Sequence, residues 1–160
     1  MERLNHILNH TKYKEYLRKN QAAEEGRIFC CHSMEHFLDV ARIAYIMNLE
    51  ESLEIDRELI YATALLHDIG RHVQYEDGTP HEEASAILAE DILKECGFRK
   101  TERTLILQAI REHRNTDMVT HKDLAGLLYR ADKASRACFA CEAEGLCNWK
   151  KEKKNMQIKY

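Results

Sequence analysis

The sequence predicts an all-α fold, a compact bundle of helices, from its composition. Its 160 residues include one proline, six glycines and three valines. Average usage would supply about eight prolines in this length, and strands are usually rich in β-branched residues. The 44% of hydrophobic residues is typical of one globular domain. We therefore expect a single domain over 1–160, with an N-terminal helix (1–25), a core (26–137) and a cysteine-containing C-terminal tail (138–160).

The first part of the chain contains two predicted helices. Residues 4–23 are helix-like and polar along one side, and Gly26 is expected to end this helix. Residues 33–48 repeat apolar side chains at helical spacing, namely Val40, Ile43, Ala44 and Met47. This stripe is typical of a helix that is half buried.

Glycines and a proline delimit the next two helices. Residues 56–68 have a dense apolar face, and Gly70 is well placed to stop this helix in the left-handed conformation. A polar loop is expected between Gly70 and the string TPHE at 79–82. That string combines a hydroxyl cap, a proline at the first helical position and an acid three residues after the cap. It predicts a helix that runs to about Cys96 and is closed by Gly97.

Two more helices complete the predicted bundle. Residues 101–113 carry one apolar face, formed by Ile106, Ala109 and Ile110. A capping box at 120–123 is expected to open the last long helix, which runs to about Ala137.

Charge and hydropathy exclude several classes of protein. The formal charge is −3, from 24 Lys plus Arg against 27 Asp plus Glu, so broad nucleic-acid binding is not expected. No apolar stretch approaches the roughly eighteen residues of a membrane span, and the N-terminus lacks the layout of a secretory signal. We expect a cytoplasmic protein whose six cysteines stay reduced. Its oligomeric state is not predicted.

Potential metal ligands fall on the apolar faces of the predicted helices, at His36, His67, Asp68, His113 and Asp132. His36, for example, shares a helical face with Val40. Taken singly, such a histidine is most often an ordinary hydrogen-bonded core residue. A buried carboxylate, however, is costly unless it is paired or binds a metal. His32 shares the face of His36 if the helix extends that far, and it could then support the ligands or be an additional metal ligand, but a surface position is expected for it.

Four of these residues form a motif that resembles the HD-domain superfamily of metal-dependent phosphohydrolases. That motif is a histidine on one helix, a His-Asp pair at the end of a later helix and a distant aspartate. Here these are His36 in HFLDVARIAYI, His67 and Asp68 in ALLHDIGR, and Asp132 in LLYRADKASR. The resemblance covers roughly residues 30–136. It implies a helical fold in which the four side chains bind one divalent metal.

Some members of this superfamily bind a second metal through two further histidines. The candidates in the right order are His81 in TPHEEASAIL and His113 in AIREHRN, and Asp68 would then bridge the two metals. We favour two metals over one. With one metal, His81 would lie at the surface and His113 would bond the backbone. The mixed ligand set suits Fe, Mn, Zn or Ni.

The resemblance implies hydrolysis of a phosphate ester or anhydride, with a small-molecule phosphoester or nucleotide as substrate. A divalent metal polarises phosphoryl oxygens and activates water as hydroxide at neutral pH. Asp68, Arg71 and, more weakly, Lys133 are the candidate catalytic residues, the two cations by gripping phosphate. Either cation could instead be simply solvated. The alternative function is a non-catalytic regulatory or interaction module that binds metal or nucleotide.

Cysteines form a separate cluster after the last predicted helix. Cys138, Cys141 and Cys147 could hold zinc or iron, with Cys31 or its neighbour Cys30 as the fourth ligand. They could instead be small buried hydrophobes. A metal site here would fasten the tail to the domain, or support a zinc-stabilised interaction module, rather than carry out catalysis.

Overall fold

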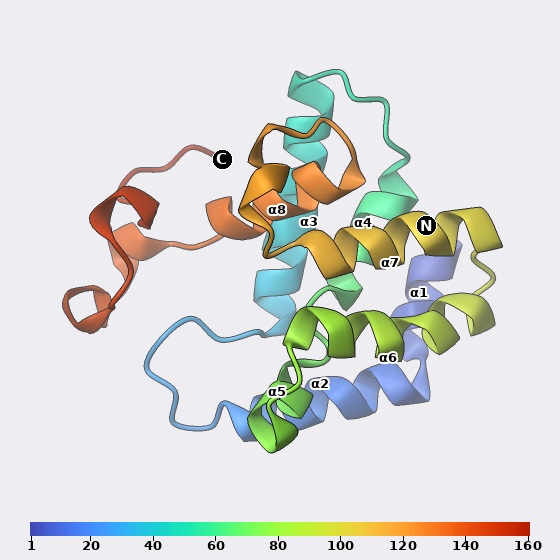
Figure 1. The fold of residues 1–160 in the computed structure, drawn as a ribbon, viewed down its shortest axis with the longest axis horizontal. Helices are drawn as coiled ribbons and strands as arrows, with labels where there is room; N and C mark the ends of the chain where they lie inside the picture. The colour runs from blue at the N-terminus through green and yellow to red at the C-terminus, as the bar shows by residue number, and fades with distance from the viewer.

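The computed structural model describes all 160 residues and contains helices and no strands (Figure 1), so the predicted all-α fold is confirmed. None of its helices has the length and apolar character that a membrane span requires. The α-helices are α1 (Glu2–Asn9), α2 (Thr11–Ala23), α3 (Met34–Glu50), α4 (Arg57–Leu66), α5 (Arg71–Asp77), α6 (His81–Glu95), α7 (Lys100–Glu112) and α8 (Leu124–Ala134). Short 3-10 helices are η1 (Thr116–Thr120), η2 (Cys138–Ala140), η3 (Glu144–Leu146) and η4 (Lys151–Lys153).

The C-terminal half of helix α4 is deeply buried, and α3, α7 and α8 all pack against this helix. Its side chains Ile60, Leu65 and Leu66 are almost completely removed from solvent. Helix α6 lies along α7, and the short helix α5 packs against both α6 and α2 (Figure 1). This arrangement brings the end of α4 to the middle of the molecule, where α3, α6, α7 and α8 surround it.

The predicted N-terminal helix is in fact two helices. The backbone at His10 is extended, with φ −67° and ψ 131°, and separates α1 from α2. The break allows α1 to pack against α4 while α2 packs against α5. As a result, Leu4 and Ile7 of α1 and Tyr13 of α2 are all buried.

The predicted loop after Gly70 is also wrong, because residues Arg71–Asp77 form α5. Gly70 has φ −91° and is not left-handed; the left-handed residue is Gly78 (φ 83°), which ends α5. Gly70 is instead needed for close packing, since a Cβ there would lie 2.5 Å from N of Ser85 and 2.8 Å from C of Ala84 in α6.

Helix boundaries near the other predicted caps shift by a few residues. Helix α6 begins at His81 with Pro80 as its N-cap, one residue later than predicted. Gly97 follows α6 with φ 83°, as expected of a closing glycine. The predicted capping box at 120–123 does not start α8. Asp123 is the N-cap instead, and its carboxylate accepts a hydrogen bond from the backbone N of Gly126, so the helix begins at Leu124.

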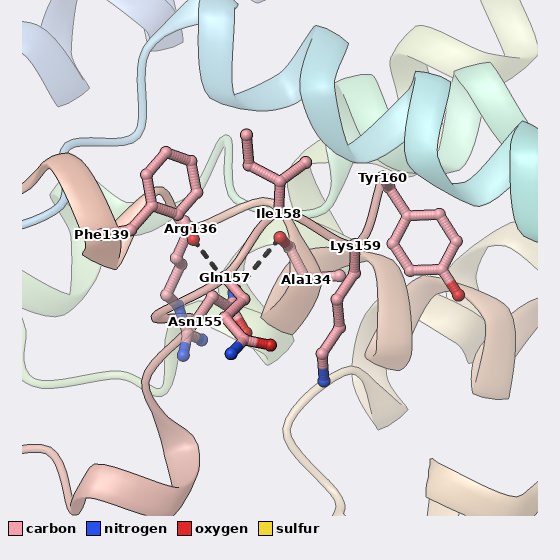
Figure 2. A pocket seen from close by; sticks show the side chains of 8 residues that line it. All are labelled: Ala134, Arg136, Phe139, Asn155, Gln157, Ile158, Lys159 and Tyr160. Atoms are coloured by element: carbon pink, nitrogen blue, oxygen red, sulfur yellow. Dashed lines mark hydrogen bonds between the residues drawn. The ribbon is translucent and has the colours of Figure 1, made fainter.

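The C-terminal tail, residues 138–160, lies to one side of the bundle (Figure 1). Its only regular structure is η2, η3 and η4, and its only buried side chain is Ala143. The tail returns to the end of α8 through Asn155, whose amide donates to the carbonyls of Ala134 (3.2 Å) and Arg136 (3.0 Å) (Figure 2). The small pocket in Figure 2 lies between these two segments.

Candidate metal centre

The six predicted His and Asp ligands converge in two groups, and within each group the potential ligand atoms lie within 4.8 Å of one another. One group is His36, His67 and Asp132, and the other is Asp68, His81 and His113. All six are buried except His36, which is partly exposed. They come from α3, the end of α4, the start of α6, the end of α7 and α8.

The turn after α4 places His67 and Asp68 at the centre. Asn20, a fully buried residue of α2, donates to the backbone O of Asp68 (2.9 Å) and accepts from the backbone N of His72 (2.8 Å). On the opposite side, N of Gly70 donates to Oγ of Ser85 (2.9 Å). The turn is therefore held between α2 and α6.

Backbone hydrogen bonds fix the orientation of two imidazoles. Nδ1 of His67 lies 2.7 Å from O of Ala64, and Nδ1 of His113 lies 2.6 Å from O of Ile110. Because a carbonyl can only accept, each Nδ1 carries a proton, and in the neutral imidazole each Nε2 presents a lone pair to the centre. Three of the potential ligand atoms in the two groups are buried without a hydrogen-bond partner: Nε2 of His36, Nε2 of His67 and Oδ1 of Asp68. Unpartnered buried atoms of this kind fit a metal as the missing partner.

Asp68 lies between the two groups. Its Oδ2 is 3.4 Å from Nε2 of His67. Its Oδ1 is 3.1 Å from Nε2 of His81 and 3.5 Å from Nε2 of His113. In the first group, Oδ1 of Asp132 is 3.5 Å from Nε2 of His36. One carboxylate thus offers a separate oxygen to each group.

The protonation states suit metal binding. Burial, with a smaller effect of His67, lowers the pKa of His36 to about 4, and burial lowers the pKa of His81 to about 3. Burial alone would raise the pKa of Asp68, but the neighbouring histidines outweigh it and hold the pKa well below its usual range. The pKa of Asp132 is likewise lowered, because the charge of Lys133 and of His67 outweighs burial. The ionised carboxylates and the neutral imidazoles of His36 and His81 are forms that bind metal ions. The pKa of His67 is raised instead, because Asp68 and Asp132 outweigh its burial, so a metal would displace a proton from this imidazole.

Cationic side chains flank both groups. Nη1 of Arg71 lies 2.8 Å from Nδ1 of His81, and Nη2 donates to the hydroxyl of Tyr75 (3.2 Å). Lys133 forms an ion pair with Asp132, and Nη2 of Arg136 lies 3.8 Å from the same carboxylate. Arg71 and Lys133, the two cations that the sequence singled out, therefore lie beside the two groups, together with Arg136, which the sequence did not single out.

His32 and Glu24 also belong to the centre, although His32 was expected at the surface. Nδ1 of His32 lies 2.5 Å from Oε1 of Glu24, and Nε2 lies 3.4 Å from Oδ2 of Asp68. The hydroxyl of Tyr75 donates to the same Oε1 (3.0 Å). The four-residue spacing to His36 was the available signal, but α3 begins at Met34, so helical spacing does not apply to His32.

The cysteines predicted as a separate metal site are not grouped in this way. No three of their sulfurs lie within 4.8 Å of one another. Sγ of Cys31 is directed at backbone carbonyls, 3.4 Å from O of Phe29 and 3.9 Å from O of Arg27. Cys96 lies apart from the others, buried in the core.

Comparison with known proteins agrees with this geometry. Residues 34–149 match the HD domain family. Over its full length the chain is 49% identical to an uncharacterized protein of Clostridium beijerinckii, which it covers completely. It is 30% identical over 129 residues to ribonuclease Y of Oleidesulfovibrio alaskensis and 32% identical over 107 residues to ribonuclease Y of Aquifex aeolicus.

These two matches cover 81% and 66% of the chain but only 23% and 18% of the respective ribonucleases. No solved structure matches the chain. The HD domain match covers most of the chain and includes the six grouped ligands. The chain therefore belongs to the HD domain family.

Proposed function

We propose that the protein is a metal-dependent phosphohydrolase that cleaves a phosphate ester or anhydride of a nucleotide. The observation that carries this proposal is the pair of buried His/Asp groups that share Asp68. Membership of the HD domain family supports it. The similarity to ribonuclease Y, whose name denotes cleavage of RNA, supports a nucleotide as the substrate class.

Six side chains would hold two divalent metals. His36, His67, Asp68 and Asp132 would bind the first, and Asp68, His81 and His113 the second, with Fe, Mn, Zn or Ni as the candidates for this mixed ligand set. When bound, such metals lower the pKa of water and polarise phosphoryl oxygens. Asp68 sets the separation of the two groups, because each of its oxygens faces one of them.

The flanking cations would bind and orient the substrate. A phosphate ester is anionic, and the guanidinium of Arg71 can hold two of its oxygens in a bidentate contact. Lys133 and Arg136 place further positive charge on the opposite side of the centre. His32, held by Glu24, lies within reach of the same space through its Nε2 and is a further group that can position a phosphoryl oxygen.

The cellular setting follows from the cysteines. All six are unpaired. Free thiols in this number fit a reducing compartment. The cytoplasm is the proposed location.

The experiment is an activity assay on the purified protein with measured metal content. A panel of nucleotides and simple phosphoesters is tested with added Mn²⁺ or Fe²⁺. We expect turnover of at least one nucleotide, and loss of both metal and activity in Asp68→Ala. Asp39→Ala is the matched control, because Asp39 is an exposed aspartate on α3. Bound metals without turnover of any substrate would instead support the non-catalytic binding module.

A further inference from the structure

The loop between α2 and α3, residues 24–33, contacts the His/Asp centre through His32. Nε2 of His32 lies 3.4 Å from Oδ2 of Asp68. The same distance separates this oxygen from Nε2 of His67, a proposed ligand of the first metal. The ring of His32 also meets the ring of His36 edge-on, with the two centroids 5.6 Å apart. His32 therefore borders the first group directly.

The two ring nitrogens of His32 are arranged like those of two proposed ligands. In His67 and His113, Nδ1 donates to a backbone carbonyl and Nε2 lies 3.4 Å and 3.5 Å, respectively, from an oxygen of Asp68. In His32, Nδ1 lies 2.5 Å from Oε1 of Glu24. Because a carboxylate can only accept, Nδ1 of His32 carries a proton, and in the neutral imidazole Nε2 has the free lone pair. Histidines that bind metals are commonly oriented by a carboxylate in this way.

Glu24 holds both the side chain and the backbone of His32. The Glu24 side chain is only 4% exposed. Its Oε2 accepts from the backbone N of His32 (2.7 Å), and its Oε1 also accepts from the hydroxyl of Tyr75 (3.0 Å). That hydroxyl in turn accepts from Nη2 of Arg71 (3.2 Å). The imidazole is therefore fixed in place although it lies in an irregular loop.

The distance from His32 to Asp68 suits two ligands of one ion. Nitrogen and oxygen ligands lie about 2.0–2.2 Å from a metal such as zinc, so neighbouring ligands are roughly 3–3.5 Å apart. Nε2 could meet either a phosphoryl oxygen, which needs a hydrogen-bond donor, or a metal ion, which needs a lone pair. The neutral imidazole that Glu24 orients offers the lone pair.

We propose that His32 is a further ligand of the first metal and that Glu24 is the residue that positions it. This inference rests on the metal centre of the proposed function. The first metal would then have five protein ligands and the second metal three. Six-coordinate ions such as Mn²⁺ would keep more open positions at the second site. Water and a phosphoryl oxygen would therefore be bound chiefly there, on the side of Arg71.

The first test titrates Mn²⁺ into metal-free, full-length protein and measures affinity by calorimetry. We expect His32→Ala to weaken the binding of one Mn²⁺ ion at least about tenfold. Glu24→Ala should weaken the same ion about tenfold. Glu24→Gln keeps an acceptor oxygen for Nδ1 and should recover part of that loss. His6→Ala and Glu25→Gln are the matched controls, because both residues are exposed, and should leave the affinity unchanged.

Unchanged Mn²⁺ affinity in His32→Ala would overturn the proposal. If that variant instead bound inorganic phosphate more weakly with both metals in place, His32 would contact the substrate rather than the metal. An equal loss of Mn²⁺ affinity in His6→Ala would overturn the proposal too, since His6 lies at the surface of α1.

A second measurement uses the wild-type chain and needs no substitution. The chain is labelled with ¹⁵N and loaded with ¹¹³Cd²⁺, so that each imidazole nitrogen bound to the ion shows scalar coupling to it in the NMR spectrum. We expect five coupled imidazoles, one more than His36, His67, His81 and His113 supply. Four would overturn the proposal. Neither measurement uses hydrolysis, so loss of the proposed function would leave both unaffected, and a negative result for His32 would leave that function standing.

Discussion

Replacing Gly70 with alanine tests the packing that joins the His67–Asp68 turn to α6. The new Cβ would lie 2.5 Å from N of Ser85 and 2.8 Å from C of Ala84. Carbon contacts settle at about 3.5–4.0 Å, so α6 must retreat by roughly 1 Å, because backbone atoms cannot rotate away. Such overpacking costs about 1–3 kcal/mol. Stretching the bond from Gly70 N to Ser85 Oγ adds about 1 kcal/mol. We expect the free energy of unfolding to fall by about 3 kcal/mol.

Urea unfolding followed by circular dichroism, at one fixed metal concentration, measures this loss. In a chain of this size it corresponds to a melting temperature lower by roughly 6–12 °C. Gly145→Ala is the control, since no atom lies within 4 Å of a Cβ at that position, and it should change stability by less than about 0.5 kcal/mol. A Gly70→Ala protein within about 0.5 kcal/mol of the wild type would refute the packing argument.

Three further predictions concern other parts of the molecule. Asn20→Ala leaves the buried backbone N–H of His72 without its acceptor and should cost about 2–3 kcal/mol in the same unfolding experiment. The hydrogen bond from Arg99 lowers the pKa of Glu102 from 4.5 to about 2, so Glu102 stabilises the fold above pH 4.5 and loses this effect as the pH falls toward 2. Glu102→Gln should therefore be about 1 kcal/mol less stable at pH 7, and unfolding curves across this pH range should show the difference vanish near pH 2. Arg71→Ala should raise KM for a nucleotide about tenfold, with partial rescue by Arg71→Lys, and an unchanged KM would contradict its role in phosphate binding.

The residues of the two His/Asp groups could be singled out because they follow rules that local sequence carries. His36 and His113 continue apolar stripes of helical spacing, and His67 and Asp68 end another. The HD motif then connects positions that helical periodicity alone cannot relate. These signals also predict the all-helical fold, since few residues in the chain break a helix.

The features that could not be predicted depend on tertiary contacts. Helix α5 has the polar sequence RHVQYED, and only His72 is buried in it, against Tyr16 at 5.7 Å between ring centroids. Gly70 resembles a helix terminator in sequence, but the need for it comes from α6. His32 lies in an irregular loop that no periodicity describes, and its place beside Asp68 depends on how that loop folds.

The order of the ligands along the chain has a consequence for folding. His36 and Asp132 belong to the same group, yet most of the bundle lies between them in sequence. A metal held by both would act as a cross-link that closes a very long loop, as a disulfide does, and would bind the native chain but not the unfolded one. The apparent stability of the whole bundle should then rise with the concentration of free metal. Starvation for metal would expose the protein to unfolding and proteolysis as well as to loss of activity.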